Sequence, residues 1–401
     1  MGDLSTTSIE GVSDEVKFEQ TMQVLELLGV GAEQQRDIQR ILAGVLYLGQ
    51  IPFLGDTDSS HIDPLYAVDA TKCCGLLGLE ESAFYKSTTV RRIATSEEEM
   101  LVSLSMDQAS DGRDALAKDT YDRLFQWLVV AINESTAAHN LVNSKSCSTV
   151  ASKIISLLDI FGFESFEINR FEQLCINYAN EKLQQRFTED VFKTVQAEYQ
   201  SEGLEWELIT YLDNADVLEL LEGKLGIMDL LNEECLVPRG SDPNFLAKVF
   251  MNNVKHPCFT SRGLEIKRDE FCIIHYAGKV TYSTTGFLDR NRDAIPSELK
   301  NLMLTTSNKL LHEIYSLDHE AKHNRRQSFL KADTVTIKFK SQLSALMDTI
   351  TGTDVQYVRC IKPNHVKSSN MFDRNMVSLV RLHQKFCYAH SLIFLSECVG
   401  I

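Results

Sequence analysis

The sequence predicts an α/β protein that is mostly helical and carries part of a central mixed sheet. Several long segments show apolar residues at helical spacing, and a short apolar run at residues 154–158 is typical of a strand buried on both faces. Residues 271–282 predict two strands separated by a glycine turn. The 401 residues, 44% of them hydrophobic, are enough for a sizeable core and for two or three domains.

Composition and charge narrow the possible functions. The formal net charge of −16 argues against nucleic acid and anionic membranes as partners, because both reward clustered Lys and Arg. The first twenty residues hold no apolar segment of a secretory signal, and no run reaches the ~18 apolar residues of a membrane helix, so no membrane insertion is expected. The ten cysteines are scattered without a Cys-x-x-Cys pair, which indicates free thiols in a reducing, cytoplasmic compartment.

The N-terminal part is expected to be helical. Residues 18–53 predict two helices with a break at Gly29, and residues 70–92 continue the helical pattern. A further helix is predicted over about 113–134, followed by a surface loop over 135–150, which is rich in Ser, Thr, Ala and Asn.

A strand, an acidic glycine turn and a long amphipathic helix are expected in succession from residue 154. Asp159 stands where the strand would end, and a carboxylate there can hold a hydrated magnesium ion. Gly162 has no Cβ, so its backbone N–H can approach a phosphate oxygen closely. Apolar residues keep helical spacing through Phe171, Leu174, Cys175, Tyr178, Leu183, Phe187 and Val191. The block therefore indicates a phosphate sensor coupled to a rigid rod.

The later segments predict further short elements. A short helix is expected within 240–252, a strand at 334–339 and a helix from Ser341 to about Ile350. His275 is a lone histidine inside an apolar strand, so we expect a hydrogen-bonded core residue rather than a catalytic base.

Two strings resemble one family closely. Asp159-Ile-Phe-Gly-Phe-Glu164 followed by Asn177-Tyr-Ala-Asn-Glu-Lys-Leu-Gln-Gln185 resembles the switch II loop and relay helix of the myosin motor domain. A second myosin-like signature is Tyr357-Val-Arg-Cys-Ile-Lys-Pro-Asn364. The resemblance implies a partial myosin-type P-loop NTPase motor.

The resemblance also implies a division of the chain. Residues 1–377 would be a motor-domain fragment: about 1–150 an upper helical region on the actin side, 151–200 switch II and relay helix, and 201–377 a lower actin-binding region with sheet strands. Residues 378–401 depart from the family pattern.

In the family resemblance, the turn closes an ATP site. Asp159 would orient the water shell of Mg²⁺, Gly162 would donate its N–H to the γ-phosphate of ATP, and Glu164 would pair with an arginine of switch I. The relay residues would be Phe171, Asn177, Glu181 and Trp206. For Trp206, packing on a converter domain and simple capping of a core stay open as alternatives.

The resemblance further implies an actin filament as partner. The expected contact residues are Gln342, Leu343, Leu346, Met347, Leu230, Leu231, Lys322, Arg325, Arg326 and Lys331. Leu230 and Leu231 fit a core equally well, and so small a basic cluster is often only a solvated surface. Light chains would join only if the full protein has a lever arm.

The phosphate cradle itself is missing from the sequence. No Gly-x-x-x-x-Gly-Lys-Ser/Thr string and no Asn-rich switch I segment occur in the 401 residues; in the family both lie upstream of the part matched here. We therefore expect a fragment of an actin-based cytoskeletal motor that is inactive as an ATPase on its own. The rival hypothesis is a non-catalytic actin-binding or scaffold remnant of a myosin head.

Overall fold

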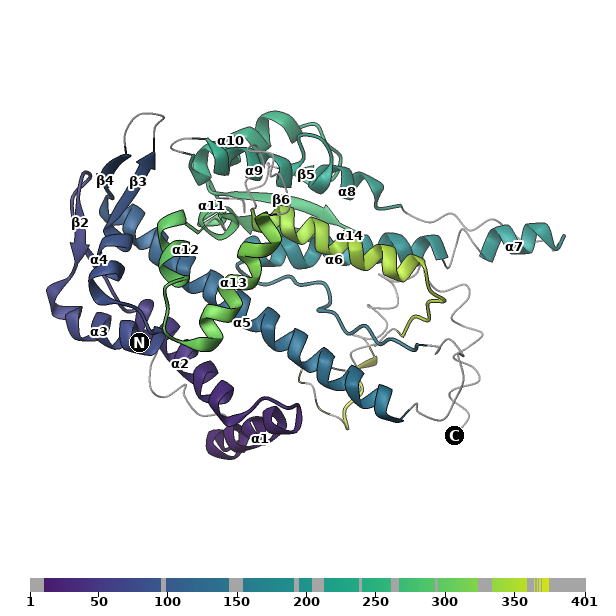
Figure 1. The fold of residues 1–401 in the computed structure, drawn as a ribbon. Coiled ribbons are helices and arrows are strands. Elements are labelled where there is room, and N and C mark those ends of the chain that lie inside the picture. Colours follow the sequence, from purple (N-terminus) through teal and green to yellow (C-terminus); the bar gives the residue numbers. More distant parts are fainter. Residues whose placement is uncertain are drawn as a thin grey trace. The chain divides into compact units, whose positions relative to one another are not determined.

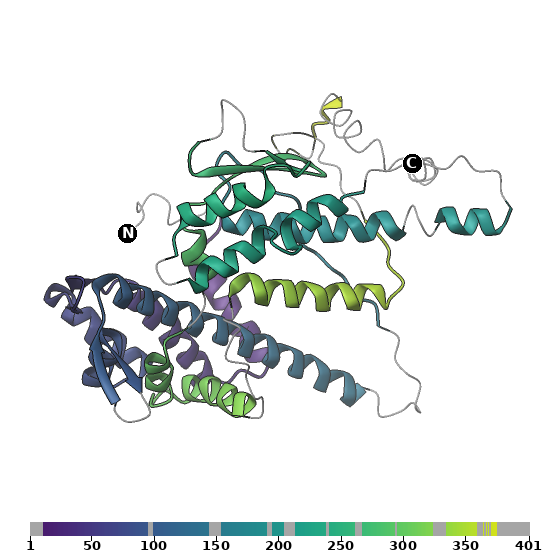
Figure 2. The same cartoon turned by 90° about the horizontal axis from the view of Figure 1, so that it is seen from above.

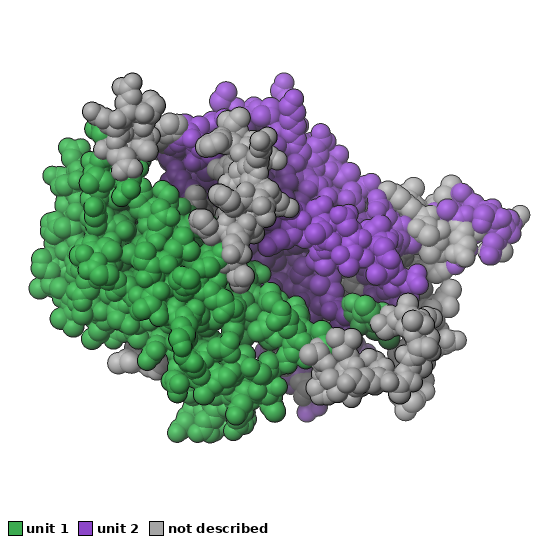
Figure 3. Space-filling view, viewed as in Figure 1, with its two compact units in different colours: residues 1–156, 293–331 green, residues 157–292, 332–401 purple. Residues whose placement is uncertain are grey.

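The structure of the chain is a computed structural model. It describes residues 11–94, 99–143, 154–190, 195–203, 213–237, 240–260, 267–292, 295–323, 334–358, 364, 366, 368 and 370–374. These residues fall into two compact units, each with its own hydrophobic core (Figure 3). Unit 1 comprises residues 1–156 and 293–331, and unit 2 comprises 157–292 and 332–401.

Unit 1 is built from helices with two small hairpins (Figure 1). Its elements are α1 (Asp14–Leu27), α2 (Ala32–Leu48), β1 (Phe53–Gly55), β2 (Ser60–Ile62), the 3₁₀ helix η2 (Pro64–Tyr66), α3 (Ala67–Leu77), α4 (Glu81–Thr89), β3 (Val90–Ala94), β4 (Glu99–Ser103), α5 (Met106–Asn143), α12 (Ser297–Met303) and α13 (Lys309–His323). The expected division placed residues 293–331 in the lower region, whereas α12 and α13 pack on the helices of unit 1.

Glycines shape the first helices of unit 1. The predicted break between two helices is confirmed, and Gly29 has a φ of +83°, which favours glycine. A Cβ at Gly44 of α2 would lie 2.5 Å from a methyl carbon of Leu77, so the missing side chain lets α2 and α3 approach closely. Ile41, Leu77 and Leu116 are fully buried in the core that α2, α3 and α5 share.

The helix α5 is longer than predicted. Residues 135–143, expected as loop, continue the helix instead. Helix-weakening hydroxyl residues can stay helical when the hydroxyl binds a carbonyl of the preceding turn. Thr136 does this, since its Oγ1 donates to the carbonyl of Ile132 at 3.0 Å.

Unit 2 combines helices with one three-stranded sheet (Figures 1 and 2). Its elements are α6 (Phe171–Thr188), α7 (Val195–Ser201), α8 (Ala215–Glu222), α9 (Ile227–Leu236), α10 (Asp242–Asn253), β5 (Phe259–Thr260), β6 (Glu270–His275), β7 (Gly278–Ser283), α11 (Phe287–Asn291) and α14 (Val335–Thr351).

The sheet of unit 2 carries an aromatic core. The two strands predicted over 271–282 are confirmed as β6 and β7, which pair antiparallel from Glu270 opposite Ser283 to His275 opposite Gly278. The rings of Phe271 and Tyr282 stack at 5.6 Å between centroids. The described strands of this sheet pair antiparallel, whereas a mixed sheet was expected, and one isolated parallel bridge joins Asn169 to Tyr282.

Two strand predictions were wrong. Residues 154–158 form no regular structure, and Ile155 and Leu157 are 93% and 97% exposed. A strand needs a hydrogen-bonded neighbour, and no described residue pairs with this run. Residues 334–339, the second case, begin helix α14.

The start of α14 has a clear physical cause. The Oγ1 of Thr334 accepts the backbone N–H of Ile337 at 3.3 Å, which is a helix N-cap. The hydroxyl of Thr336 donates to Asn232 at 2.6 Å, and its backbone N–H donates to Asn291 at 2.9 Å. These tertiary bonds outweigh the strand preference of β-branched residues.

The described cysteines are buried or half-buried. The six described cysteines are free thiols, and burial raises the pKa of Cys73, Cys74 and Cys175 to about 12. Cys235, Cys258 and Cys272 also have raised pKa values because of burial. No described helix is long and apolar enough to cross a membrane.

Candidate functional site

The acidic glycine turn lies on α6 in unit 2. Asp159 and Gly162 are exposed, while Glu164 is half-buried. Ahead of the turn the chain is extended and exposed, and behind it α6 starts at Phe171 (Figure 1). Phe171 is 4% exposed and packs edge-on against Phe287 at 5.8 Å between centroids, which anchors the start of the helix in the core.

The side chain of Asn177 clamps the turn to α6. Its Oδ1 accepts the backbone N–H of Glu164 at 2.9 Å, and its Nδ2 donates to the carbonyl of the same residue at 2.8 Å. Because one amide satisfies both backbone groups of one residue, the turn cannot shift without breaking two hydrogen bonds. Asn177 is fully buried, so water does not compete for these bonds.

A second amide holds the turn one helical turn further on. The Nδ2 of Asn180 donates to the carbonyl of Phe161 at 2.9 Å. The spacing Asn177-Tyr-Ala-Asn180 puts both amides on one face of α6. The residues predicted from the sequence include Asn177 but not Asn180, although the spacing of three positions between them could have indicated Asn180.

Other side chains secure the flanks of the turn. The ring of Phe163 meets those of His275 and Tyr276 edge-on, at 5.2 and 5.6 Å between centroids. Downstream, Asn169 accepts the N–H of Phe166 at 2.8 Å, and its Nδ2 donates to the carbonyl of Thr281 at 3.0 Å. Both ends of the turn are therefore tied to β6 and β7.

Glu181 lies in a buried polar cluster behind the turn. Its Oε1 is 2.9 Å from the Nδ1 of His275 and accepts the N–H of Tyr276 at 3.1 Å. Its Oε2 accepts the Nδ2 of Asn214 at 2.5 Å. His275 is 4% exposed and fully hydrogen-bonded, as expected for a core histidine.

The second signature segment meets the far end of α6. Tyr357 packs edge-on against Phe187 at 4.9 Å, and its hydroxyl donates to Asp190 at 2.7 Å. Burial and this bond to a carboxylate raise the pKa of Tyr357. The fully buried Asn364 donates to the carbonyls of Ser368 and Met371 at 2.7 and 2.6 Å.

The groups of the turn suit recognition rather than acid–base catalysis. No described group hydrogen-bonds or pairs with the Asp159 carboxylate, which leaves it open to an ordered water. A Cβ at Gly162 would meet nothing within 4 Å, so its backbone is open to approach. The Oε2 of Glu164 accepts the Nε2 of Gln173 at 3.3 Å.

A metal at this turn would need ligands beyond the described protein groups. The described residues hold no cluster of three or more His, Cys, Asp or Glu side chains that could bind a metal ion. A single exposed carboxylate fits an ion held through water together with a phosphate ligand, as magnesium commonly is. The residues present therefore fit Mg²⁺ bound with a nucleotide.

Several expected partner-binding residues lie in the core, which corrects part of the sequence prediction. Leu230, Leu231 and Leu343 are 2%, 0% and 5% exposed, so a filament could not reach them in this conformation. Gln342 is exposed, while Leu346 and Met347 are half-buried beside the core. α14 runs beside α6 (Figures 1 and 2).

Four of the predicted residues lie outside the described part of the chain: Trp206, Arg325, Arg326 and Lys331. Lys322 belongs to the last turn of α13, and nothing is described of its side chain.

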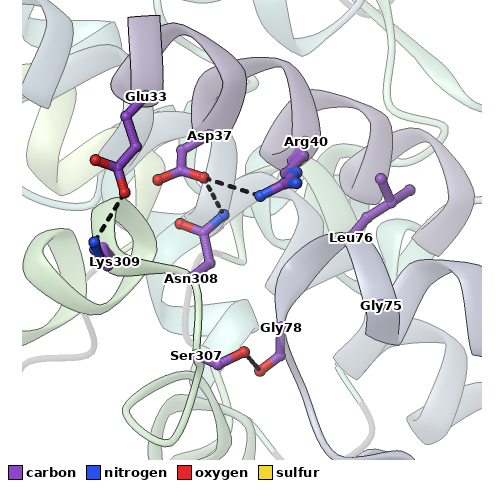
Figure 4. Close-up of a pocket in the computed structure, with 9 residues that line it drawn as sticks. All are labelled: Glu33, Asp37, Arg40, Gly75, Leu76, Gly78, Ser307, Asn308 and Lys309. Atoms are coloured by element: carbon purple, nitrogen blue, oxygen red, sulfur yellow. Dashed lines mark hydrogen bonds and ion pairs between the residues drawn. The ribbon is translucent and has the colours of Figure 1, made fainter. Parts of the chain in front are cut away.

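Unit 1 contains a small polar cavity, shown in Figure 4. It measures about 190 Å³ and lies between α2, the end of α3 and the start of α13. Lys309 pairs with Glu33 at 2.8 Å and Arg40 with Asp37 at 3.6 Å, so its charges are matched internally. Small-molecule sites usually enclose about 300 Å³ or more, which argues against a nucleotide site here.

Comparison with known proteins identifies strong similarity along most of the chain. The sequence matches the family described as Myosin head (motor domain) over residues 2–385. It is 38% identical to Myosin-2B of Naumovozyma castellii over 92% of this chain and 26% of that protein. Unconventional myosin-Vb of Rattus norvegicus is 38% identical over 92% of this chain and 20% of its own length.

A plant relative gives the same picture. Protein OPAQUE1 of Zea mays is 39% identical over 96% of this chain and 24% of its own length. The chain thus spans between a fifth and about a quarter of the length of these curated relatives.

Proposed function

The chain belongs to the myosin head (motor domain) family, and we propose that it is the switch II, relay and actin-binding segment of an actin-based cytoskeletal motor driven by ATP. The observation that carries this proposal is the amide clamp: Asn177 and Asn180 of α6 bind the backbone of the acidic glycine turn. A turn fixed to a helix by three hydrogen bonds passes its displacement to that helix.

In the proposed mechanism, the turn responds to the γ-phosphate of ATP. The N–H of Gly162 would donate to a phosphate oxygen, and the Asp159 carboxylate would hold Mg²⁺ through water. Mg²⁺ supplies the charge that neutralises the phosphates when it is bound. Glu164 offers a carboxylate to an arginine of another segment of the motor, which would hold the turn closed.

Movement of the turn is then passed along α6. The turn pulls on the amides of Asn177 and Asn180, and Phe171 acts as the anchored end. At the other end, Phe187 and Tyr357 are in contact, so a tilt of α6 would displace the segment that begins at Tyr357. The helix is long and continuous enough to act as a rod.

The proposed actin surface is narrower than the sequence indicated. Gln342, Leu346 and Met347 on α14 keep accessible atoms, and Leu236 and Val237 at the end of α9 are 56% and 39% exposed. Apolar side chains exposed next to one another favour a protein partner. Cytoplasmic, cytoskeletal localisation belongs to the same proposal, as does light-chain binding if the full protein has a lever arm.

A chimaera tests the proposal directly. Residues 2–385 would replace the matching part of a myosin-Vb motor domain, and actin-activated ATPase and filament gliding would be measured. We expect both activities to survive. Gly162→Ala in the chimaera should abolish turnover while the unfolding midpoint stays unchanged, because the added Cβ meets no atom of the protein.

A glycine in unit 1 provides the control for Gly162→Ala. Gly75→Ala is an equally open position in unit 1 and should leave ATPase activity unaltered. A chimaera that folds and sediments with actin, but neither turns over ATP nor is released by it, would favour the scaffold alternative and overturn the motor proposal.

A further inference from the structure

A chain of buried side chains connects the clamp to the interior of unit 2. The Nδ2 of Asn177 donates to the hydroxyl of Tyr282 at 2.8 Å, and that hydroxyl lies 2.8 Å from the Nε2 of His275. The Nδ1 of His275 lies 2.9 Å from the Oε1 of Glu181. The side chains of His275 and Glu181 are 0% exposed, and Tyr282 is also fully buried.

The direction of every proton in this chain follows from one backbone residue. Glu164 offers an N–H and a carbonyl to Asn177, so the amide oxygen must accept and the amide nitrogen must donate. The second hydrogen of that nitrogen then points at the oxygen of Tyr282, which acts as acceptor.

The remaining protons are fixed in turn. The tyrosine hydrogen goes to the Nε2 of His275, which must therefore be unprotonated. The proton of the neutral imidazole sits on Nδ1 and is donated to the Glu181 carboxylate. A proton on Nε2 would leave the tyrosine hydroxyl hydrogen without a described acceptor, buried and at a cost of about 1–3 kcal/mol.

We propose that Tyr282, His275 and Glu181 are positioning residues that lock the Asn177 amide in the one orientation able to hold the turn at Glu164. Glu181 fixes the imidazole tautomer, the imidazole orients the tyrosine hydroxyl, and the hydroxyl orients the amide. In assigning residues 159–164 as the moving turn, this inference rests on the proposed function. None of the three side chains contacts the reacting groups, so they act only through Asn177.

The docked turn and the orientation of the Tyr282 hydroxyl are thus coupled. When the turn leaves Asn177, the amide loses both backbone partners and is free to flip. A flipped amide presents its oxygen to Tyr282, so the hydroxyl hydrogen turns to that oxygen and the Nε2 of His275 loses its donor, while the Nδ1 proton stays in its hydrogen bond to the Glu181 carboxylate. Simple core packing would not require any particular tautomer.

Nitrogen-15 NMR of the histidine rings in the intact 401-residue chain tests the proton assignment. His275→Gln identifies the His275 signals by their loss. We expect Nε2 unprotonated and Nδ1 protonated in the absence of nucleotide and actin. A protonated Nε2, in either the other tautomer or the imidazolium, would overturn the proposal.

Hydrogen exchange at the Glu164 amide tests the mechanical consequence. Tyr282→Phe removes only the hydroxyl, and we expect exchange of that amide to accelerate about tenfold, which corresponds to a loss of about 1.4 kcal/mol. Tyr315→Phe is the matched control, because it removes a buried hydroxyl that binds Thr120 in unit 1. It should leave Glu164 unchanged.

The outcomes are distinct from those of the proposed function. Unchanged exchange in a folded Tyr282→Phe protein would overturn the positioning role, even if the chimaera is an active motor. An inactive chimaera with the expected tautomer and exchange would leave the positioning role standing. If Tyr282→Phe fails to fold, the His275 tautomer measured in the unmodified chain still tests the proposal.

Discussion

The two units bury polar groups in different ways. In unit 1, the buried side chains of Thr306 and Asn308 close helix ends: Thr306 donates to the carbonyl of Leu77 at 2.5 Å, and Asn308 accepts the N–H of Leu311 at 3.0 Å. In unit 2, Asn177, His275 and Glu181 are joined through side chains drawn from α6, β6 and β7. Local caps stabilise one fixed geometry, whereas a side-chain chain couples separate segments and can exist in two states.

The largest expected effect comes from breaking the polar chain of unit 2. Glu181→Ala leaves His275, the N–H of Tyr276 and Asn214 without their buried acceptor, and should destabilise unit 2 by about 3 kcal/mol or more. Urea-dependent hydrogen exchange resolved by unit would measure this. Glu33→Ala, whose partner Lys309 is exposed, should change unit 1 little. Equal losses in the two units would contradict the contrast.

Steric packing should dominate in unit 1. Gly44→Ala pushes a methyl group into Leu77 and should cost about 1–3 kcal/mol, measured as a lower urea midpoint for unit 1. The matched control is Gly75→Ala in α3, which meets open space and should stabilise the unit by about 0.5–1 kcal/mol. If both changes had the same sign, the close approach of α2 and α3 would not be a constraint.

Acid should weaken unit 2 through Glu234. Burial raises the pKa of this carboxyl, but the ammonium of Lys248 at 2.9 Å and the N–H of Ser241 at 3.1 Å outweigh it, so the pKa lies below the ordinary 4.5. A lowered pKa adds stability above pH 4.5 that is lost as the pH falls through the folded value. Glu234→Gln should therefore flatten the decline of the unfolding free energy below pH 4.5, as followed by denaturant titration. An unchanged slope would refute this assignment.

The smallest predicted effect concerns a single strained residue. Leu225, between α8 and α9, has a φ of +61° and is 49% exposed. Leu225→Gly removes the strain of a left-handed side-chain residue and should raise the unfolding free energy of unit 2 by less than about 1 kcal/mol. A calorimetric melt would measure it, and a loss of stability would show that the side chain packs usefully.

Local patterns in the sequence predicted most helices and the hairpin of residues 271–282, because those elements are set by the spacing of nearby residues. The errors occur where contacts with residues distant in the sequence determine the local structure. Residues 154–158 are apolar but have no described neighbour to pair with, and Thr334 starts a helix because Asn232 and Asn291 bind its first turn.

The candidate site was predicted in part for the same reason. The turn and Asn177 follow from the string itself, whereas the bond from Asn177 to Tyr282 joins residues 105 positions apart. A spacing rule on one helix could indicate Asn180, but no local rule could assign Tyr282 to the clamp. Leu230 and Leu231 fitted an interface and a core equally well by sequence, and in the structure both are buried in the core.

The path of the chain between the units bears on how the protein is made. The chain passes from unit 1 to unit 2 near residue 156, returns near 293 and leaves again near 331. On the ribosome, the first unit therefore waits for α12 and α13, and by then α6 to α11 of the second have already emerged. Neither unit is one uninterrupted stretch of the chain, so the two units must fold together. Until α12 and α13 have been synthesised, the helices before residue 156 stay exposed to chaperones and to misassembly.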